Sequence, residues 1–190
     1  MISVYPIALM TMRGIISSLA ICLGLVASGL AHAATLPLNG FTLEHIEPTR
    51  MTGRWYEVAR LPNKIQKDCQ GGTSDWVRTG EGFQVLQSCH RGSLLAPATE
   101  WHARAKILDP KTNARIKMSF FGGVVNLEYW VLEHKADQGW LILATPDGKY
   151  LWLMSQRPTL ASGVKAQAVA QIRQFGFDVS RLEFPPGLKN

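Results

Sequence analysis

Eight short segments with the composition of β-strands follow one another along the chain, and turn-forming sequences separate most of them. The expected strands span residues 53–62, 72–78, 83–89, 100–108, 114–121, 126–134, 140–144 and 150–155. The turns read "TGEG" at 79–82, "DPKTN" at 109–113, "FGG" at 121–123, "DQG" at 137–139 and "TPDGK" at 145–149. Because connections of this length suit hairpins, we expect consecutive strands to pair antiparallel in sequence order.

A single helix is expected after the last strand, over residues 162–175. Val164, Ala168, Ile172 and Phe175 recur on one face of it, and Gly176 is placed as a C-terminal stop. A helix with one apolar stripe is expected to pack that stripe against one surface of the rest of the protein. An eight-stranded meander with one external helix predicts an all-β protein, an antiparallel up-and-down β-barrel with the C-terminal α-helix packed outside, because closure removes exposed strand edges.

The N-terminal segment predicts export. An apolar run at 15–30 follows Arg13 and ends in Ala31-His32-Ala33, so we expect residues 1–33 to be a signal peptide and residues 34–190 the mature domain. Met12-Arg13 would make a more typical beginning than the apolar residues before it, and the sequence leaves both Met1 and Met12 as the start. Cys22 raises the alternative of a lipid anchor, but Ile21 precedes it where a small residue would be needed. Cleavage near Ala33 and release to the periplasm are therefore expected, rather than attachment to the outer membrane.

Two cysteines remain in the expected mature chain, Cys69 and Cys89, and an even pair in an exported protein predicts a disulfide. The alternative is two free buried thiols. A regular hairpin about the turn at 79–82 would place Cys89 opposite Gly72, so the disulfide needs a bulge at Gly71-Gly72.

The charge balance favours anionic partners. The chain has 20 Lys and Arg against 14 Asp and Glu, a net charge of +6, of which Arg13 in the leader supplies one. Contact with an anionic membrane surface fits this balance. No basic run or recognition helix accompanies it, and export argues against nucleic acid as a partner.

The sequence contains no recognisable catalytic or metal-binding pattern. His45, His90, His102 and His134 lie outside metal-binding spacings, so we expect neither a metal nor a cofactor. The protein is not expected to be an enzyme.

Three motifs resemble the lipocalin family, in its bacterial Blc and apolipoprotein D branch. "GRWYEVARLP" at 53–62 is similar to the first lipocalin motif, "TPDGKYLWLMSQRP" at 145–158 to the second and third, and "NLEYWVLEHKADQGWLIL" at 126–143 to the hairpin between them. The resemblance runs from about Phe41 to Phe184. It implies motif roles for Gly53, Trp55, Thr145, Asp147, Tyr150, Gln156 and Arg157.

The resemblance also implies that Trp55 closes one end of the barrel, with Gly53 letting the chain turn into the first strand. In the family an arginine after the last strand packs on this tryptophan. Here Gln156 stands at that position and Arg157 is displaced by one. Strand alternation points Gln156 inward and Arg157 outward.

Alternation and resemblance together predict a lined cavity. The resemblance places Trp130 and Trp152 inward, and alternation adds their neighbours. The fourth strand has a smoother face that should also point inward, leaving His102, Arg104 and Lys106 to solvent. The expected ligand-binding residues are Glu57, Ala59, Trp101, Ala103, Ala105, Glu128, Trp130, Leu132, Tyr150, Trp152 and Met154. For any one of them the alternative is ordinary barrel packing. Glu57 and Glu128, as two inward carboxylates, are expected to orient a ligand head group or to lie solvated near an opening, rather than to catalyse.

The resemblance implies a carrier that binds a fatty acid or lysophospholipid in the bacterial envelope, for lipid storage or transport in membrane maintenance. Two alternatives use the same barrel. One is a tetrapyrrole or other pigment binder with His102 or His134 as axial ligand, and the other is an enzyme, which would need a catalytic pair that the sequence does not show. A homodimer is left open.

Overall fold

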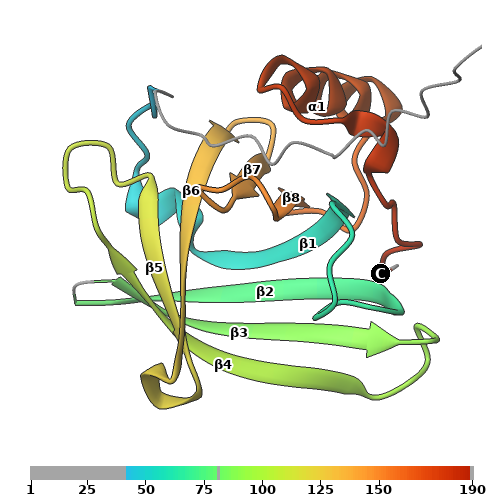
Figure 1. Ribbon diagram of the computed structural model, residues 1–190, viewed down its shortest axis with the longest axis horizontal. Coiled ribbons are helices and arrows are strands. Elements are labelled where there is room, and N and C mark those ends of the chain that lie inside the picture. The colour runs from blue at the N-terminus through green and yellow to red at the C-terminus, as the bar shows by residue number, and fades with distance from the viewer. Residues whose placement is uncertain (1–41, 81, 189–190) are drawn as a thin grey trace, which may run out of the picture. The chain divides into compact units, whose positions relative to one another are not determined.

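A computed structural model describes residues 42–80 and 82–188 as a closed antiparallel barrel (Figure 1). The expected signal peptide and Cys22 lie outside the described residues. The strands are β1 (Gly53–Arg60), β2 (Cys69–Thr79), β3 (Gly82–Arg91), β4 (Ala98–Ile107), β5 (Arg115–Phe120), β6 (Val125–Lys135), β7 (Trp140–Ala144) and β8 (Leu151–Ser155). The helices are α1 (Ser162–Gln174) and three short 3-10 turns, η1 (Pro48–Met51), η2 (Phe121–Gly123) and η3 (Val179–Arg181).

Each strand pairs with its sequence neighbour, and β8 pairs with β1 to close the barrel. The predicted fold class is therefore confirmed. None of the described helices is long and apolar enough to cross a membrane.

Two separate apolar cores hold the barrel and its helix together. The inner core fills part of the barrel and includes Trp55, Phe83 and Met118. The outer core lies between the barrel wall and α1, where Ala168 and Ile172 of the helix are fully buried. Figure 1 shows α1 outside the barrel, beside β7 and β8. The predicted apolar stripe of the helix is confirmed.

Up-and-down topology places alternate connections at the same end of the barrel. The segments 61–68, 92–97, 121–124 and 145–150, here called the mouth loops, therefore lie together at one end, which we call the mouth. In the last of them Thr145 Oγ1 donates to Asp147 Oδ1 at 2.7 Å, and the Tyr150 amide donates to Thr145 Oγ1 at 3.1 Å. These motif residues thus organise the turn between β7 and β8.

Three β-bulges interrupt the ladders and change which side chains face inward. They lie between Glu57 and Ala59, between Cys69 and Gly71, and between Val131 and Glu133. Each inserts one extra residue, so the residues after it exchange faces relative to simple alternation.

The bulge in β2 allows the predicted disulfide. Cys89 pairs with Gly72, as a regular hairpin requires, and the extra residue is Gln70. The insertion brings Cys69 beside Cys89 with Cα atoms 5.6 Å apart, and the two form a disulfide. The expected bulge is present, one residue earlier than Gly71-Gly72.

Trp55 plugs the end of the barrel opposite the mouth. Its side chain is 1% exposed, and its Nε1 donates to the Met51 carbonyl at 2.8 Å. Gly53 has φ +96°, a conformation that residues with a Cβ rarely adopt, so a glycine suits the turn into β1.

The predicted inward orientation of Gln156 is wrong, because both Gln156 and Arg157 are exposed. The backbone N–H of Gln156 donates to the Gly139 carbonyl at 2.9 Å, which holds the end of β8 at the surface. The ring that meets Trp55 edge to face belongs to His134 of β6, with centroids 5.9 Å apart. His134 turns inward because the bulge at Leu132 reverses the alternation of β6.

His134 should make stability depend on pH. Burial, together with the charge of Arg50, lowers the pKa of His134 below its usual value near 6.5. The unfolded chain therefore takes up a proton first as the pH falls below 6.5, and the fold loses stability there. Between pH 7.5 and 5.5 the melting temperature should fall more steeply for the wild type than for His134→Phe, as calorimetry would measure. Equal slopes would contradict this role.

Candidate functional site

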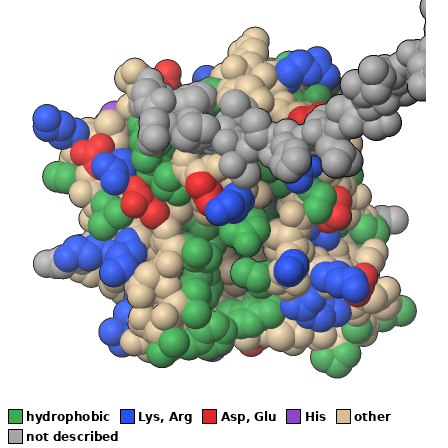
Figure 2. Space-filling view, in the orientation of Figure 1, with side chains coloured by type: hydrophobic (Ala, Val, Ile, Leu, Met, Phe, Trp, Pro, Cys, Tyr) green, Lys and Arg blue, Asp and Glu red, His purple; other side chains and the backbone are tan. Residues whose placement is uncertain are grey.

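A cavity of about 370 Å³ lies inside the barrel and reaches from Trp55 to the mouth loops. Its walls are mostly apolar and aromatic, with residues from all eight strands. Its size falls in the range of small-molecule sites. Figure 2 shows hydrophobic side chains gathered around a hollow in the lower centre of the face, with Lys and Arg beside them.

Five of the predicted ligand-binding residues lie on the cavity wall: Glu57, Trp101, Tyr150, Trp152 and Met154. Trp152 meets Tyr129 edge to face with centroids 5.2 Å apart, so the two rings form one stretch of wall. Ala103 and Ala105 face the inner core but do not reach the cavity.

A buried ion pair occupies the wall near the mouth. Arg60 is 5% exposed and Glu57 is 3% exposed, and the Arg60 guanidinium donates to Glu57 Oε1. Arg60 also donates to Glu183 at 2.9 Å and to the Cys69 carbonyl at 3.2 Å. Simple alternation would point Arg60 outward, but the bulge at Val58 brings it to the side of Glu57.

Gln66 ties the first mouth loop to this ion pair. Its Nε2 donates to Glu57 Oε2, and its Oε1 accepts from Trp152 Nε1 at 2.7 Å. Gly72 leaves room for the carboxylate, since a Cβ there would lie 3.2 Å from Glu57 Oε2. Burial raises the pKa of Glu57, and attraction to Arg60 opposes that rise only in part. Both carboxylate oxygens are occupied, so Glu57 serves to hold the loop.

Comparison with known proteins decides the family. A family model described as "Lipocalin-like domain" matches residues 46–187. This chain belongs to the lipocalin family. It is 30% identical over 166 residues to "Outer membrane lipoprotein Blc" of Vibrio cholerae, covering 85% of this chain and 88% of that relative. The protein of the same name from Escherichia coli K12 is 27% identical, with 80% and 86% covered.

Solved structures agree with the lipocalin fold. Insecticyanin from the tobacco hornworm Manduca sexta superimposes with a TM-score of 0.62 at 20% identity, covering 75% of this chain and 82% of that one. The cockroach allergen Per a 4 gives a TM-score of 0.61 at 16% identity, with 77% and 91% covered. At these identities the likeness concerns the fold alone.

Four other predicted ligand-binding residues of this lipocalin, Ala59, Glu128, Trp130 and Leu132, lie on the outer face of the barrel wall, so their predicted inward orientation is wrong. Trp130 Nε1 donates to Glu128 Oε1 at 2.6 Å, and Arg115 bonds the same carboxylate at 2.8 Å while lying 5.5 Å from the Trp130 ring centre. Leu132 and Ala59 pack in the outer core beneath α1. Glu57 and Glu128 thus lie on opposite sides of the wall and do not form a pair.

In β6 the cavity is lined by Leu127 and Tyr129, the neighbours of Glu128 and Trp130, with Val125 nearer the mouth. Tyr129 is 5% exposed, and its hydroxyl has no hydrogen bond within residues 42–80 and 82–188. Burial raises the pKa of Tyr129, so the group stays protonated. It can therefore donate a hydrogen bond to a ligand oxygen.

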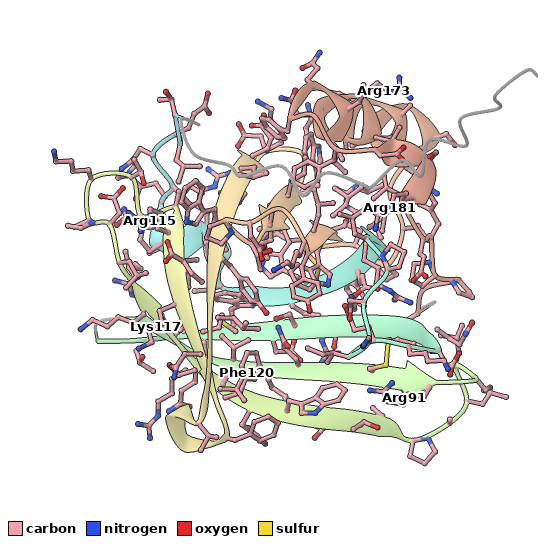
Figure 3. The ribbon with its side chains drawn as sticks, in the orientation of Figure 1. Arg91, Arg115, Lys117, Phe120, Arg173 and Arg181 are labelled. Carbon is pink, nitrogen blue, oxygen red and sulfur yellow. A yellow bond between two sulfur atoms is a disulfide. The ribbon has the colours of Figure 1, made fainter. Side chains whose placement is uncertain are left out.

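Strand pairing contained the signal for these residues. Across the turn at 121–123, Arg115 pairs with Trp130 and Lys117 with Glu128. Paired residues of antiparallel strands share a face, so the alternation of β5 between charged and apolar residues sets the faces of β6. Figure 3 shows Arg115 and Phe120 at opposite ends of β5.

Proposed function

We propose that this lipocalin binds one single-chain amphipathic lipid, a fatty acid or lysophospholipid, and stores or carries it in the cell envelope for membrane maintenance. The observation that carries the proposal is the apolar cavity opening toward the mouth loops. An eight-stranded barrel has room for one small ligand. The acyl chain lies among the aromatic walls, and the head group stays toward the mouth, because Glu57 already has its partners.

The energetics suit a carrier that exchanges its cargo. Burying about 12 methylenes contributes roughly 10 kcal/mol at about 0.8 kcal/mol each. Association costs at least roughly 4 kcal/mol. The remainder of about 6 kcal/mol corresponds to a Kd in the tens of micromolar.

No observation favours the pigment or enzyme alternatives. Neither histidine considered as an axial ligand lines the cavity: His102 is exposed on β4, and His134 lies beside Trp55. Among the described residues there is no group of three His, Cys, Asp or Glu that could hold a metal. The apolar and aromatic lining of the cavity supports a binding role.

Native mass spectrometry of the protein purified from its own envelope tests the proposal. We expect one co-purifying lipid per chain, with the mass of a fatty acid or lysophospholipid. A tetrapyrrole, or a cavity that exchanges no lipid when fatty acid is added, would contradict it.

Export to the envelope is part of the proposal, and the relatives named outer membrane lipoprotein support it. We expect cleavage near Ala33 and release to the periplasm, because Ile21 before Cys22 does not suit lipid modification. The intact mass of the mature protein should match a chain that begins near Ala34. A diacylglyceryl group on an N-terminal Cys22 would show that the protein is anchored instead.

A further inference from the structure

Large apolar side chains are exposed on three of the four mouth loops. Ile65 is 56% exposed, Leu95 96%, Phe121 62% and Val124 83%. These four residues, here called the mouth rim, come from distant parts of the sequence, and the barrel topology places them at one end. Figure 1 shows the β3–β4 connection at the right and the β5–β6 connection at the bottom. Apolar groups gathered at the mouth of a ligand cavity favour an interaction surface there.

The mouth rim is continuous with the cavity. Ile65 and Phe121 are exposed to solvent and also line the cavity wall. An acyl chain passing between them would stay against apolar side chains along its way into the barrel. A protein partner would not require this continuity, whereas a lipid surface that exchanges cargo would.

The first mouth loop is fixed so that Ile65 stands between two exposed lysines. Arg91 donates to the Lys67 carbonyl and to the Ile65 carbonyl, both at 2.7 Å, and its guanidinium lies 5.6 Å from the Trp101 ring centre. Figure 3 shows Arg91 near the end of β3. The loop therefore presents its apolar side chain from a defined backbone position.

Charge at the mouth suits an anionic surface. Lys64 and Lys67 are exposed, and no carboxylate of the described residues forms an ion pair with either. In the last mouth loop Lys149 pairs with Asp147 at 2.9 Å, which leaves Asp68 as the opposing charge. Basic side chains beside apolar ones are the combination that binds anionic membrane interfaces.

We propose that the mouth rim docks on an anionic lipid bilayer. Lys64 and Lys67 then lie at the lipid head groups, and the apolar side chains of the rim insert between the head groups. Cargo then passes between the bilayer and the cavity without crossing water. Docking stands on the rim itself, while the exchange step rests on the proposed function.

Flotation of the mature chain, residues 34–190, with lipid vesicles tests the docking. We expect binding to phosphatidylglycerol-containing vesicles, much weaker binding to phosphatidylcholine vesicles, and release as the salt concentration rises. The variant Leu95→Ser with Val124→Ser should bind roughly tenfold less. These two residues do not line the cavity, so titration with a soluble fatty acid should be unaffected.

The matched control is Val77→Ser with Leu108→Ser. These residues are 61% and 40% exposed and lie toward the opposite end of the barrel, so vesicle binding should not change. Equal losses in both double variants, or no wild-type binding, would overturn the proposal. So would a rim variant that changes only the oligomeric state in light scattering, since a second copy would then cover the rim. Failed docking with intact fatty-acid binding would leave the proposed function standing.

Discussion

Replacing Arg60 with methionine should lower the free energy of unfolding by about 3–5 kcal/mol, the usual effect of breaking a buried ion pair. The substitution leaves the Glu57 carboxylate in the barrel wall with Gln66 as its remaining side-chain partner. It also removes the bonds from Arg60 to the Cys69 carbonyl and to Glu183. Urea unfolding followed by circular dichroism measures the loss.

Two further variants separate the buried charge from lost packing. Adding Glu57→Gln to Arg60→Met should recover part of the stability, because no unpaired charge then remains. Arg54→Met breaks an ion pair with Asp75 in which Arg54 is exposed, and it should cost no more than about 1 kcal/mol. The account of the buried pair fails if Arg60→Met and Arg54→Met have equal effects.

The second large effect is expected from a charge placed in the cavity wall. Trp152→Glu should weaken binding of a long-chain fatty acid by about 3 kcal/mol or more, over a hundredfold in Kd, because a carboxylate would have to be desolvated beside the acyl chain. Trp152→Leu keeps the wall apolar and should weaken binding by only about 1–2 kcal/mol. Isothermal titration with palmitate measures both.

Trp130→Glu is the matched control, since Trp130 lies on the outer face of the wall beside Arg115. It should leave the affinity for palmitate nearly unchanged. If Trp130→Glu abolished binding and Trp152→Glu did not, the inward and outward assignment of the barrel wall would be reversed.

Local sequence patterns were sufficient to predict the barrel. Turn sequences such as "DPKTN" and "TPDGK" limit each strand, and the short connections leave few ways to order the strands. Trp55 as the plug of the closed end followed from the lipocalin resemblance, and the structure places it there. The edges of the strands moved by only a few residues, because turn chemistry is local.

Side-chain orientation was harder to predict wherever a bulge or an ambiguous strand intervened. No local feature announces the bulge at Val58, which turns Ala59 out and Arg60 in. β6 has large aromatic residues on both faces, Tyr129 and Trp130, so its own alternation cannot choose between them. The neighbouring strand β5 decides which face of β6 points outward, because Arg115 and Lys117 must face solvent and their partners in β6 share that face.

Contacts at the mouth and at the closed end of the barrel also could not be predicted from local sequence. Gln66 contacts Trp152 from 86 residues away in the sequence, and His134 reaches Trp55 only because β6 is bulged. Such contacts depend on the closed barrel as a whole. They therefore cannot be predicted from the sequence of a single strand.

The most direct test of the central claim is isothermal titration calorimetry of the delipidated mature protein, with lysophosphatidylethanolamine and with palmitate as ligands. The account predicts saturable binding in the micromolar class, with one ligand per barrel, for at least one of the two lipids. Absence of saturable binding for both lipids, or several ligands per chain bound with equal affinity in wild type and Trp152→Glu, would contradict a lipid site inside the barrel.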